Sequence, residues 1–197
     1  RCAGTLAEIG CTSFFPAKPL GCYGDGGALF TNDDNLASLF RSIRVHGQGI
    51  DRYENVRLGL TGRLDAVQAA VLIPKLSIFP DELTARQRVA STSENLISST
   101  HLELITPKVP KGYFSAWAQY SVLAPDQTAR RRILDQLKVA GVPTMIYYSK
   151  PLHLQKALSN LGYQKGDFPV SEEVSQRIFS LPIDRKSTRL NSSHLLI

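Results

Sequence analysis

The order of apolar and polar positions predicts alternating strands and helices in the first part of the chain. Residues 9–15 form a short apolar and β-branched run that indicates a buried strand, and residues 27–31 indicate a second strand after a glycine-rich turn. Apolar residues at helical spacing predict a helix over 35–45, with capping side chains available at 32–34. Residues 47–63 follow neither period, so we expect a long loop there.

A helical pattern returns at residue 64 and continues to residue 96. Its first apolar positions share one face: Leu64, Val67, Val71, Leu72 and Leu76. Pro74 and Pro80 interrupt the pattern without ending it, so we expect one long helix that is bent at the prolines. This helix would lead out of a first α/β domain, and we place the domain boundary near residue 100.

The remaining chain changes to a mixed pattern that predicts a small α+β domain over residues 101–183. Expected strands cover 102–105, 118–123 and 144–148, and expected helices cover 128–140, 153–161 and 171–179. On the central helix, Ile133, Leu134 and Leu137 should face inward, and Gly141 should end it. The fold class expected is therefore α/β followed by α+β, without an internal repeat.

Composition adds little beyond this picture. With 43% hydrophobic and 20% charged residues, the 197-residue chain is typical of a globular protein, which excludes disorder and collagen-like structure. No apolar stretch is long enough to span a membrane and no secretory signal is apparent, so we expect a soluble, cytoplasmic protein. Cys2, Cys11 and Cys22 have the spacing of neither a disulfide framework nor a zinc site.

The net charge of +6 does not identify a partner. Three of the cations, Arg185, Lys186 and Arg189, follow Asp184 without any later acid, so the rest of the chain carries only +3. The other basic residues are scattered, except for a cluster at 130–132, and no nucleic-acid-binding motif is present. We therefore expect neither a nucleic-acid partner nor a membrane partner.

Lys18 is the most prominent candidate for chemistry. It lies in a proline-stiffened loop after the first strand, at the kind of sheet edge where α/β proteins bind ligands. A partly desolvated lysine can act as an amine nucleophile toward an aldehyde, and Ser13 could bind a phosphate at the same edge. Spacing alone leaves open a second interpretation, in which Lys18 is a solvated residue beside a glycine turn.

The segment from Ser13 to Gly21, with the Gly-Asp-Gly-Gly run at 24–27, resembles the internal-lysine signature of the DegT/DnrJ/EryC1/StrS family of pyridoxal-phosphate sugar aminotransferases. The resemblance extends over roughly residues 3 to 182. Further matching motifs are Arg44-Val45-His46-Gly47, Gly62-Arg63-Leu64-Asp65-Ala66-Val67-Gln68-Ala69-Ala70, Gly141-Val142-Pro143, Tyr147-Tyr148 and Pro151-Leu152-His153. The nearest branch acts on UDP-linked 3-keto-hexuronic acids in surface-polysaccharide pathways.

This resemblance implies an aspartate-aminotransferase-like fold (fold type I) with a large cofactor-binding domain and a small C-terminal domain. It implies that Lys18 holds pyridoxal 5'-phosphate as a Schiff base and shuttles protons, and that Ser13 contacts the cofactor phosphate. Thr61 stands where many members carry an asparagine that reaches the partner subunit's cofactor, so a homodimer is implied. A threonine hydroxyl has less reach than an amide, which puts this contact in doubt.

The resemblance also places three residues near the sugar substrate: Arg63, Tyr147 and Tyr148. A guanidinium matches a uronate carboxylate, although an Arg63–Asp65 ion pair within the chain is an equal alternative. One or both tyrosines could instead pack into the core. His101 and His153 have no carboxylate or cysteine nearby in sequence, so no metal site is expected.

The resemblance further implies that part of the cofactor domain lies upstream of this sequence, including the carboxylate for the cofactor's ring nitrogen. The chain would then be roughly the latter half of a subunit, and we expect it not to transaminate on its own. Residues 184–197 resemble translated sequencing-adapter sequence, which suggests a non-native tail. The reaction implied is amino transfer from glutamate to a nucleotide-linked keto sugar; the alternative is an inactive family member with a regulatory or binding role.

Overall fold

The computed structural model describes residues 1–183, which fall into two compact units. The first unit is Arg1–Pro80, and the second begins at Asp81. The division thus comes earlier than the boundary we expected near residue 100, because helix α3 (Phe79–Ser98) buries Val89, Ala90 and Ile97 in the core of the second unit. The suggestion of a non-native tail at 184–197 lies outside the described residues.

The first unit contains an antiparallel hairpin of β1 (Gly10–Ser13) and β2 (Gly27–Phe30). The pairing joins Gly10 to Phe30 at one end and Ser13 to Gly27 at the other. Both strands lie where the sequence predicts them. The expectation that the first strand is buried was wrong, because only Gly10 of β1 is buried and a two-stranded sheet covers neither of its own faces.

Helix α1 (Asp34–Ile43) follows β2 and confirms the predicted helix and its cap. The carboxylate of Asp33 accepts hydrogen bonds from the amides of Asn35 at 2.7 Å and Leu36 at 3.2 Å. After α1 the chain forms the predicted long loop, which is interrupted only by isolated bridges that pair Val45 with Thr61 and Gln48 with Asn55.

Two helices replace the single bent helix that we predicted. Helix α2 (Ala66–Ser77) ends at Ile78, and α3 starts immediately after it. Pro74 is accommodated inside α2, whereas Pro80 lies in the first turn of α3, where no intrahelical N–H bond is lost. The apolar positions predicted to share one face are mostly not buried: of the α2 residues only Leu72 is buried, while Val67 and Leu76 are 72% and 58% exposed.

The second unit is built around the antiparallel pair β3 (Tyr120–Leu123) and β4 (Ile178–Leu181). Between them in the sequence lies α4 (Gln127–Val139). Its N-cap is Asp126, whose carboxylate accepts a hydrogen bond from the Ala129 amide at 2.8 Å. The helix ends just before Gly141, which has a positive φ of +73°. This confirms the predicted helix and the role of the glycine.

Several smaller elements of this unit differ from the prediction. The expected strands at 102–105 and 144–148 are reduced to isolated bridges, Ile105 with Leu123 and Met145 with Ser180. The expected helix at 153–161 is a pair of short 3-10 helices, η1 (Leu152–Leu154) and η2 (Lys156–Leu161). Helix α5 (Pro169–Arg177) passes directly into β4, and the predicted helix at 171–179 had included the first two residues of this strand because short apolar runs fit both structures.

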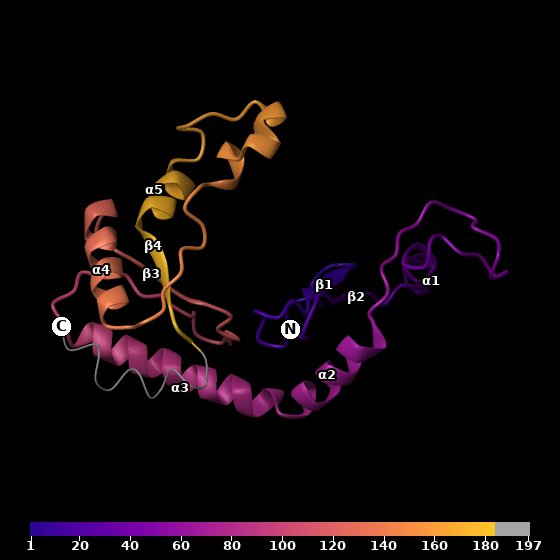
Figure 1. The fold of residues 1–197 in the computed structure, drawn as a ribbon, viewed down its shortest axis with the longest axis horizontal. Coiled ribbons are helices and arrows are strands. Elements are labelled where there is room, and N and C mark those ends of the chain that lie inside the picture. The colour runs from indigo at the N-terminus through magenta and orange to yellow at the C-terminus, as the bar shows by residue number, and fades with distance from the viewer. Residues whose placement is uncertain (184–197) are drawn as a thin grey trace. The chain divides into compact units, whose positions relative to one another are not determined.

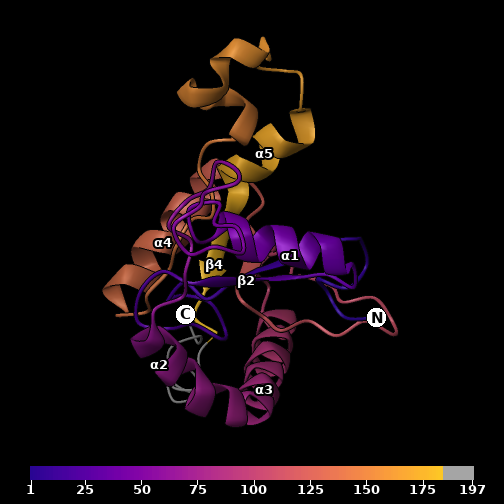
Figure 2. The ribbon, with the colours of Figure 1, turned by 90° about the vertical axis from the view of Figure 1, so that its right-hand side faces the viewer.

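The core of the second unit joins its strands to α3 and α4. In Figure 1, α4 and the β3–β4 pair lie on the same side of α3, and Figure 2 shows α5 running into β4. The buried residues of this core are Val89, Ala90, Ile97, Tyr120, Val122, Ala124, Leu137, Phe179 and Ile183. Ile133 and Leu134 pack against it, as predicted. Among the described residues, no helix is both long and apolar enough to cross a membrane.

Candidate active site

Lys18 lies in the loop between β1 and β2, here called the lysine loop (residues 14–26). Two backbone hydrogen bonds close its base, from Phe14 N to Gly26 O and from Cys22 N to Phe14 O, each 2.8 Å. At its tip the amide of Lys18 donates to Phe15 O at 2.8 Å. The lysine is therefore carried by an ordered turn at the end of a strand.

Cys22 holds the lysine loop together from inside. Its side chain is fully buried, and its thiol donates toward Phe14 O at 3.0 Å and Gly24 O at 3.1 Å. A Cβ atom on Gly26 would come within 3.0 Å of the Cys22 sulfur and 2.9 Å of Leu64 Cδ1. The glycine therefore allows this close packing, and Cys22 has a structural position rather than the reactive exposure of a nucleophile.

Helix α2 contacts the lysine loop through two polar side chains that sequence reasoning did not single out. Gln68 Oε1 accepts from the amide of Tyr23 at 2.8 Å. Lys75 Nζ donates to Gly21 O at 2.5 Å and lies 4.4 Å from the centre of the Tyr23 ring. The signal available in the sequence was their spacing with Leu72, which places the three side chains on one helical face.

The lysine loop and the last residue of β1 together offer the two groups that a phosphorylated aldehyde requires. The side chain of Lys18 is exposed and has no polar partner within residues 1–183, so its amine is free to bond. The expected partial desolvation of Lys18 is not present in the described residues, because the turn leaves its side chain on the surface. Ser13 Oγ accepts from Phe15 N at 3.2 Å, which leaves the hydroxyl proton available to a phosphate. The residues therefore fit pyridoxal phosphate.

Thr61 and Arg63 lie at the end of the long loop of the first unit, and both are exposed. The backbone of Thr61 forms the bridge to Val45. Arg63 forms no ion pair with Asp65 in the described part of the chain, so the alternative interpretation of this arginine is not supported. No hydrogen bond within residues 1–183 links either side chain to the lysine loop.

A cavity of about 910 Å³ lies close to these residues in the first unit. It is lined by parts of β1, β2 and α1, together with Gly62 and Leu64, which flank Arg63. Thr12 of its lining directly precedes Ser13. None of Ser13, Lys18, Thr61 and Arg63 is itself among the residues that line it.

Tyr147 and Tyr148 belong to the second unit and are described separately for that reason. Their rings are 5.6 Å apart in an edge-to-face arrangement. Tyr148 is 72% exposed and Tyr147 is half-buried, and neither is part of the buried core. Packing into the core therefore does not account for Tyr148, which is available to a ligand.

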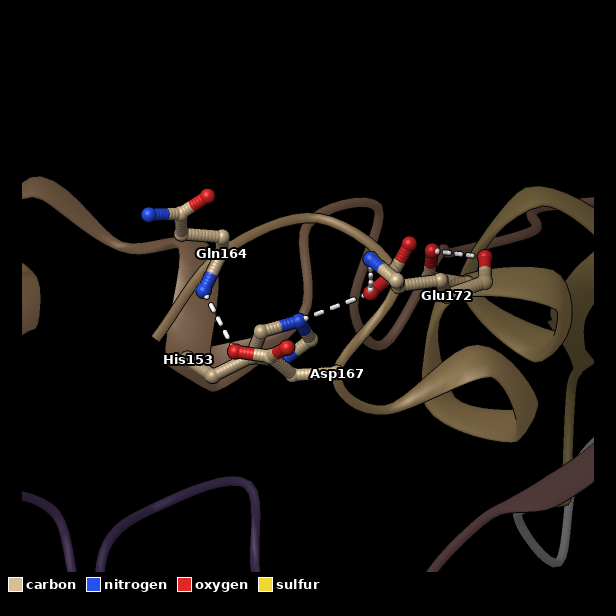
Figure 3. A network of polar contacts seen from close by, with 6 residues as sticks. His153, Gln164, Asp167 and Glu172 are labelled. Carbon is tan, nitrogen blue, oxygen red and sulfur yellow. Dashed lines mark hydrogen bonds and ion pairs between the residues drawn. The ribbon is translucent and has the colours of Figure 1, made fainter. Parts of the chain in front are cut away.

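His153 and Glu172 form an enclosed ion pair in the second unit (Figure 3). Their Nε2 and Oε1 atoms are 3.0 Å apart, and their side chains are only 7% and 11% exposed. The amide of Gly166 donates to the same Oε1 at 2.7 Å. This backbone hydrogen bond, followed by the interactions with His153, lowers the pKa of Glu172 against the opposing effect of desolvation.

Glu172 is nineteen residues from His153, so the absence of a carboxylate near His153 in sequence did not reveal this pair, which forms because the fold brings α5 back to η1. Figure 3 shows the neighbouring turn, in which Asp167 accepts from the backbone amide of Gln164 at 2.7 Å. Within residues 1–183 no three His, Cys, Asp or Glu residues are grouped as a metal site would require.

Comparison with known proteins identifies the class to which this site belongs. Residues 1–193 match the DegT/DnrJ/EryC1/StrS aminotransferase family, and the chain belongs to that family. A crystal structure of a DegT DnrJ EryC1 StrS aminotransferase from Brucella abortus is 45% identical, with a TM-score of 0.86 over 95% of this chain and 49% of the other. This likeness confirms the predicted fold class.

Two curated relatives are similar over most of the chain. UDP-2-acetamido-2-deoxy-3-oxo-D-glucuronate aminotransferase of Pseudomonas aeruginosa is 44% identical over 90% of this chain and 47% of its own length. A pleiotropic regulatory protein of Geobacillus stearothermophilus is 40% identical over 93% of this chain and 48% of its own length. The chain thus spans about half the length of the curated relatives it matches.

Proposed function

We propose that the full-length protein containing this sequence is a pyridoxal-phosphate-dependent aminotransferase. It would move an amino group from an amino acid, glutamate, to a nucleotide-linked keto sugar in surface-polysaccharide biosynthesis. The observation that carries this proposal is the free amine of Lys18 on an ordered loop, within a chain of the aminotransferase family.

Lys18 and Ser13 would have separate roles at the cofactor. Lys18 Nζ would hold the cofactor through its aldehyde carbon and, once released, carry a proton to and from the reacting carbon. The hydroxyl of Ser13 would donate a hydrogen bond to the cofactor phosphate. When bound, pyridoxal phosphate supplies an electron sink for the carbon that loses the proton.

Substrate binding would involve Arg63, Tyr147 and Tyr148. The name of the 44% identical Pseudomonas relative describes a 3-oxo-glucuronate substrate, which carries a carboxylate. Arg63 is exposed and without an ion-pair partner in the described residues, so its guanidinium is available to bind such a carboxylate in a bidentate manner. The exposed ring of Tyr148 would pack against the sugar.

The proposal includes a homodimer in the cytoplasm, in which Thr61 would approach the cofactor of the partner subunit. In terms of domains, residues 1–100 would form part of the cofactor domain with its connecting helices, of which α3 also packs into the core of the second unit, and residues 101–183 would complete the small domain. Thr61 is exposed on the first unit, as this cross-subunit role requires.

The proposal is tested by measuring amino-sugar nucleotide formation by mass spectrometry in the full-length protein, with glutamate and a UDP-linked 3-keto-hexuronic acid. Wild type should form the product, and Lys18→Ala should lose it to background. Lys111→Ala is the matched control, because this exposed lysine lies in the second unit, and it should retain activity. Product formation by Lys18→Ala at the wild-type rate would contradict the proposal.

A second candidate function is a regulatory or binding role without catalysis. It is favoured by the 40% identical relative whose name describes a regulatory protein. In that case the wild type would neither retain pyridoxal phosphate on Lys18 after borohydride reduction nor form an amino sugar.

A further inference from the structure

One face of α2 is turned toward the lysine loop. Gln68, Leu72 and Lys75 follow each other at intervals of four and three residues, so they share one side of the helix. Leu72 is the one buried residue of α2, and the two polar residues on either side of it are half-buried. By contrast, Val67 and Ile73 on the same helix are each 72% exposed. The Gln68–Leu72–Lys75 face is therefore the contact face of α2.

Lys75 connects α2 to the backbone that carries Lys18. Its Nζ donates to Gly21 O at 2.5 Å. Gly21 itself is tightly packed, because a Cβ atom there would lie 2.7 Å from Phe15 O and 2.8 Å from Pro16 O. Phe15 O in turn accepts from the Lys18 amide at 2.8 Å. An unbroken series of contacts thus leads from the Lys75 ammonium to the Lys18 backbone.

Gln68 holds the next part of the same loop. Its Oε1 accepts from Tyr23 N at 2.8 Å. Its Nε2 lies so near Gly24 that a Cβ atom on this glycine would come within 3.0 Å of it. Lys75 also lies over the Tyr23 ring at 4.4 Å, so the two α2 side chains fix residues 21–24 from both ends.

We propose that Gln68 and Lys75 are positioning residues that hold the lysine loop so that Lys18 meets its cofactor. This inference rests on the proposed function. The Lys18 side chain is exposed and without a polar partner in the described residues, so its own contacts do not fix its direction. A free lysine side chain has many rotamers, and the backbone of the loop then decides which region its amine samples.

The test uses the full-length protein and five variants. Lys75→Met keeps the stem of the side chain but removes the donor, and Gln68→Leu removes the acceptor. Lys75→Arg and Gln68→Glu keep a donor and an acceptor, respectively, and serve as conservative rescues. Ile73→Ala is the matched control, because it shortens an exposed side chain of the same helix. Thermal unfolding first establishes that each variant is folded.

Two quantities are then measured. The first is amide hydrogen exchange of the peptide covering residues 14–26 without cofactor. The second is the extent of borohydride trapping of pyridoxal phosphate on Lys18 as its concentration is raised, which gives an apparent dissociation constant. Loss of one hydrogen bond should raise both the exchange rate and this constant roughly fivefold in Lys75→Met and Gln68→Leu. The conservative variants and Ile73→Ala should match the wild type.

The measurements distinguish failure of the positioning role from failure of the proposed function. If wild-type Lys18 is trapped and both Lys75→Met and Gln68→Leu are trapped at the same concentration, the positioning role is wrong while the proposed function stands. A raised apparent dissociation constant without rescue by Lys75→Arg or Gln68→Glu would also contradict the positioning role, because a general loss of packing would then explain it. If the wild type is not trapped on Lys18, the proposed function fails and the inference fails with it.

Discussion

The two units of this chain differ in how they are held together. Within the described residues, the second unit has a continuous core of nine buried apolar residues, most of them in helices and strands. In the first unit the buried apolar side chains are those of Cys22 and Leu72, and short-range hydrogen bonds order its loops. Because burial of apolar surface is the main term that offsets chain entropy, the second unit is built to fold by itself and the first is not. The candidate cofactor lysine lies on the first.

Exposed apolar side chains strengthen this contrast. In the long loop of the first unit Ile50, Tyr53 and Leu58 are 107%, 89% and 97% exposed. Such extensive exposure typically marks a surface that contacts further protein. The lysine loop is held locally by its own hydrogen bonds and by α2, and we expect the unit that carries it to need further contacts in order to fold.

The largest expected effect comes from separating the units. Residues 81–183 expressed alone should unfold cooperatively in urea and give a dispersed amide NMR spectrum, because they contain the whole core. Residues 1–80 alone should do neither. A dispersed spectrum of 1–80 would show that the first unit does not depend on further structure.

A smaller effect on stability is expected from shortening a buried side chain in the core of the second unit. Phe179 is fully buried, so Phe179→Ala should lower the free energy of unfolding by about 3–5 kcal/mol. Phe114→Ala is the control, since Phe114 is 67% exposed and its loss should cost less than about 0.5 kcal/mol. Equal effects in urea denaturation would contradict the assignment of the core.

The N-cap residues of α1 and α4 allow a further comparison of the stability of the two units. Asp126→Ala removes the acceptor for the Ala129 amide and should lower the free energy of unfolding of the second unit by about 1 kcal/mol. The corresponding cap of the first unit, Asp33, accepts two amides. If the units are independent, Asp33→Ala should leave the urea midpoint of the second unit unchanged, and a shift would show that they unfold together.

The smallest effect is a pH dependence at Glu172. Its pKa is lowered in the folded state, so its carboxylate stabilises the fold above the ordinary glutamate pKa of about 4.3, and this contribution is lost as the pH falls through the lower folded value. The gap in urea midpoint between wild type and Glu172→Gln should therefore be present at about pH 6 and shrink toward about pH 3. A gap that widens in acid would contradict this.

Sequence alone predicted the features that depend on local pattern. The caps at Asp33 and Asp126 and the glycine end of α4 follow from short-range chemistry, and the structure confirms them. Features that depend on distant partners were missed. The first two residues of β4 were included in a predicted helix, and the His153–Glu172 pair was not foreseen, because both features require segments far apart in sequence to meet.

The same limit applies to the candidate site. The lysine loop could be located from its prolines and glycines, and its resemblance to a family signature supplied the candidate roles. The contacts of Gln68 and Lys75 with residues 21–24 could not be predicted, because periodicity shows which residues share a helix face but not what that face meets.

The most direct test of the central claim is peptide mass mapping of the full-length protein after incubation with pyridoxal phosphate and borohydride reduction. The reduced cofactor should be attached to the peptide containing Lys18, and Lys18→Arg should carry none. Attachment to a different lysine in an active enzyme, or transamination that persists without any label on Lys18, would contradict it.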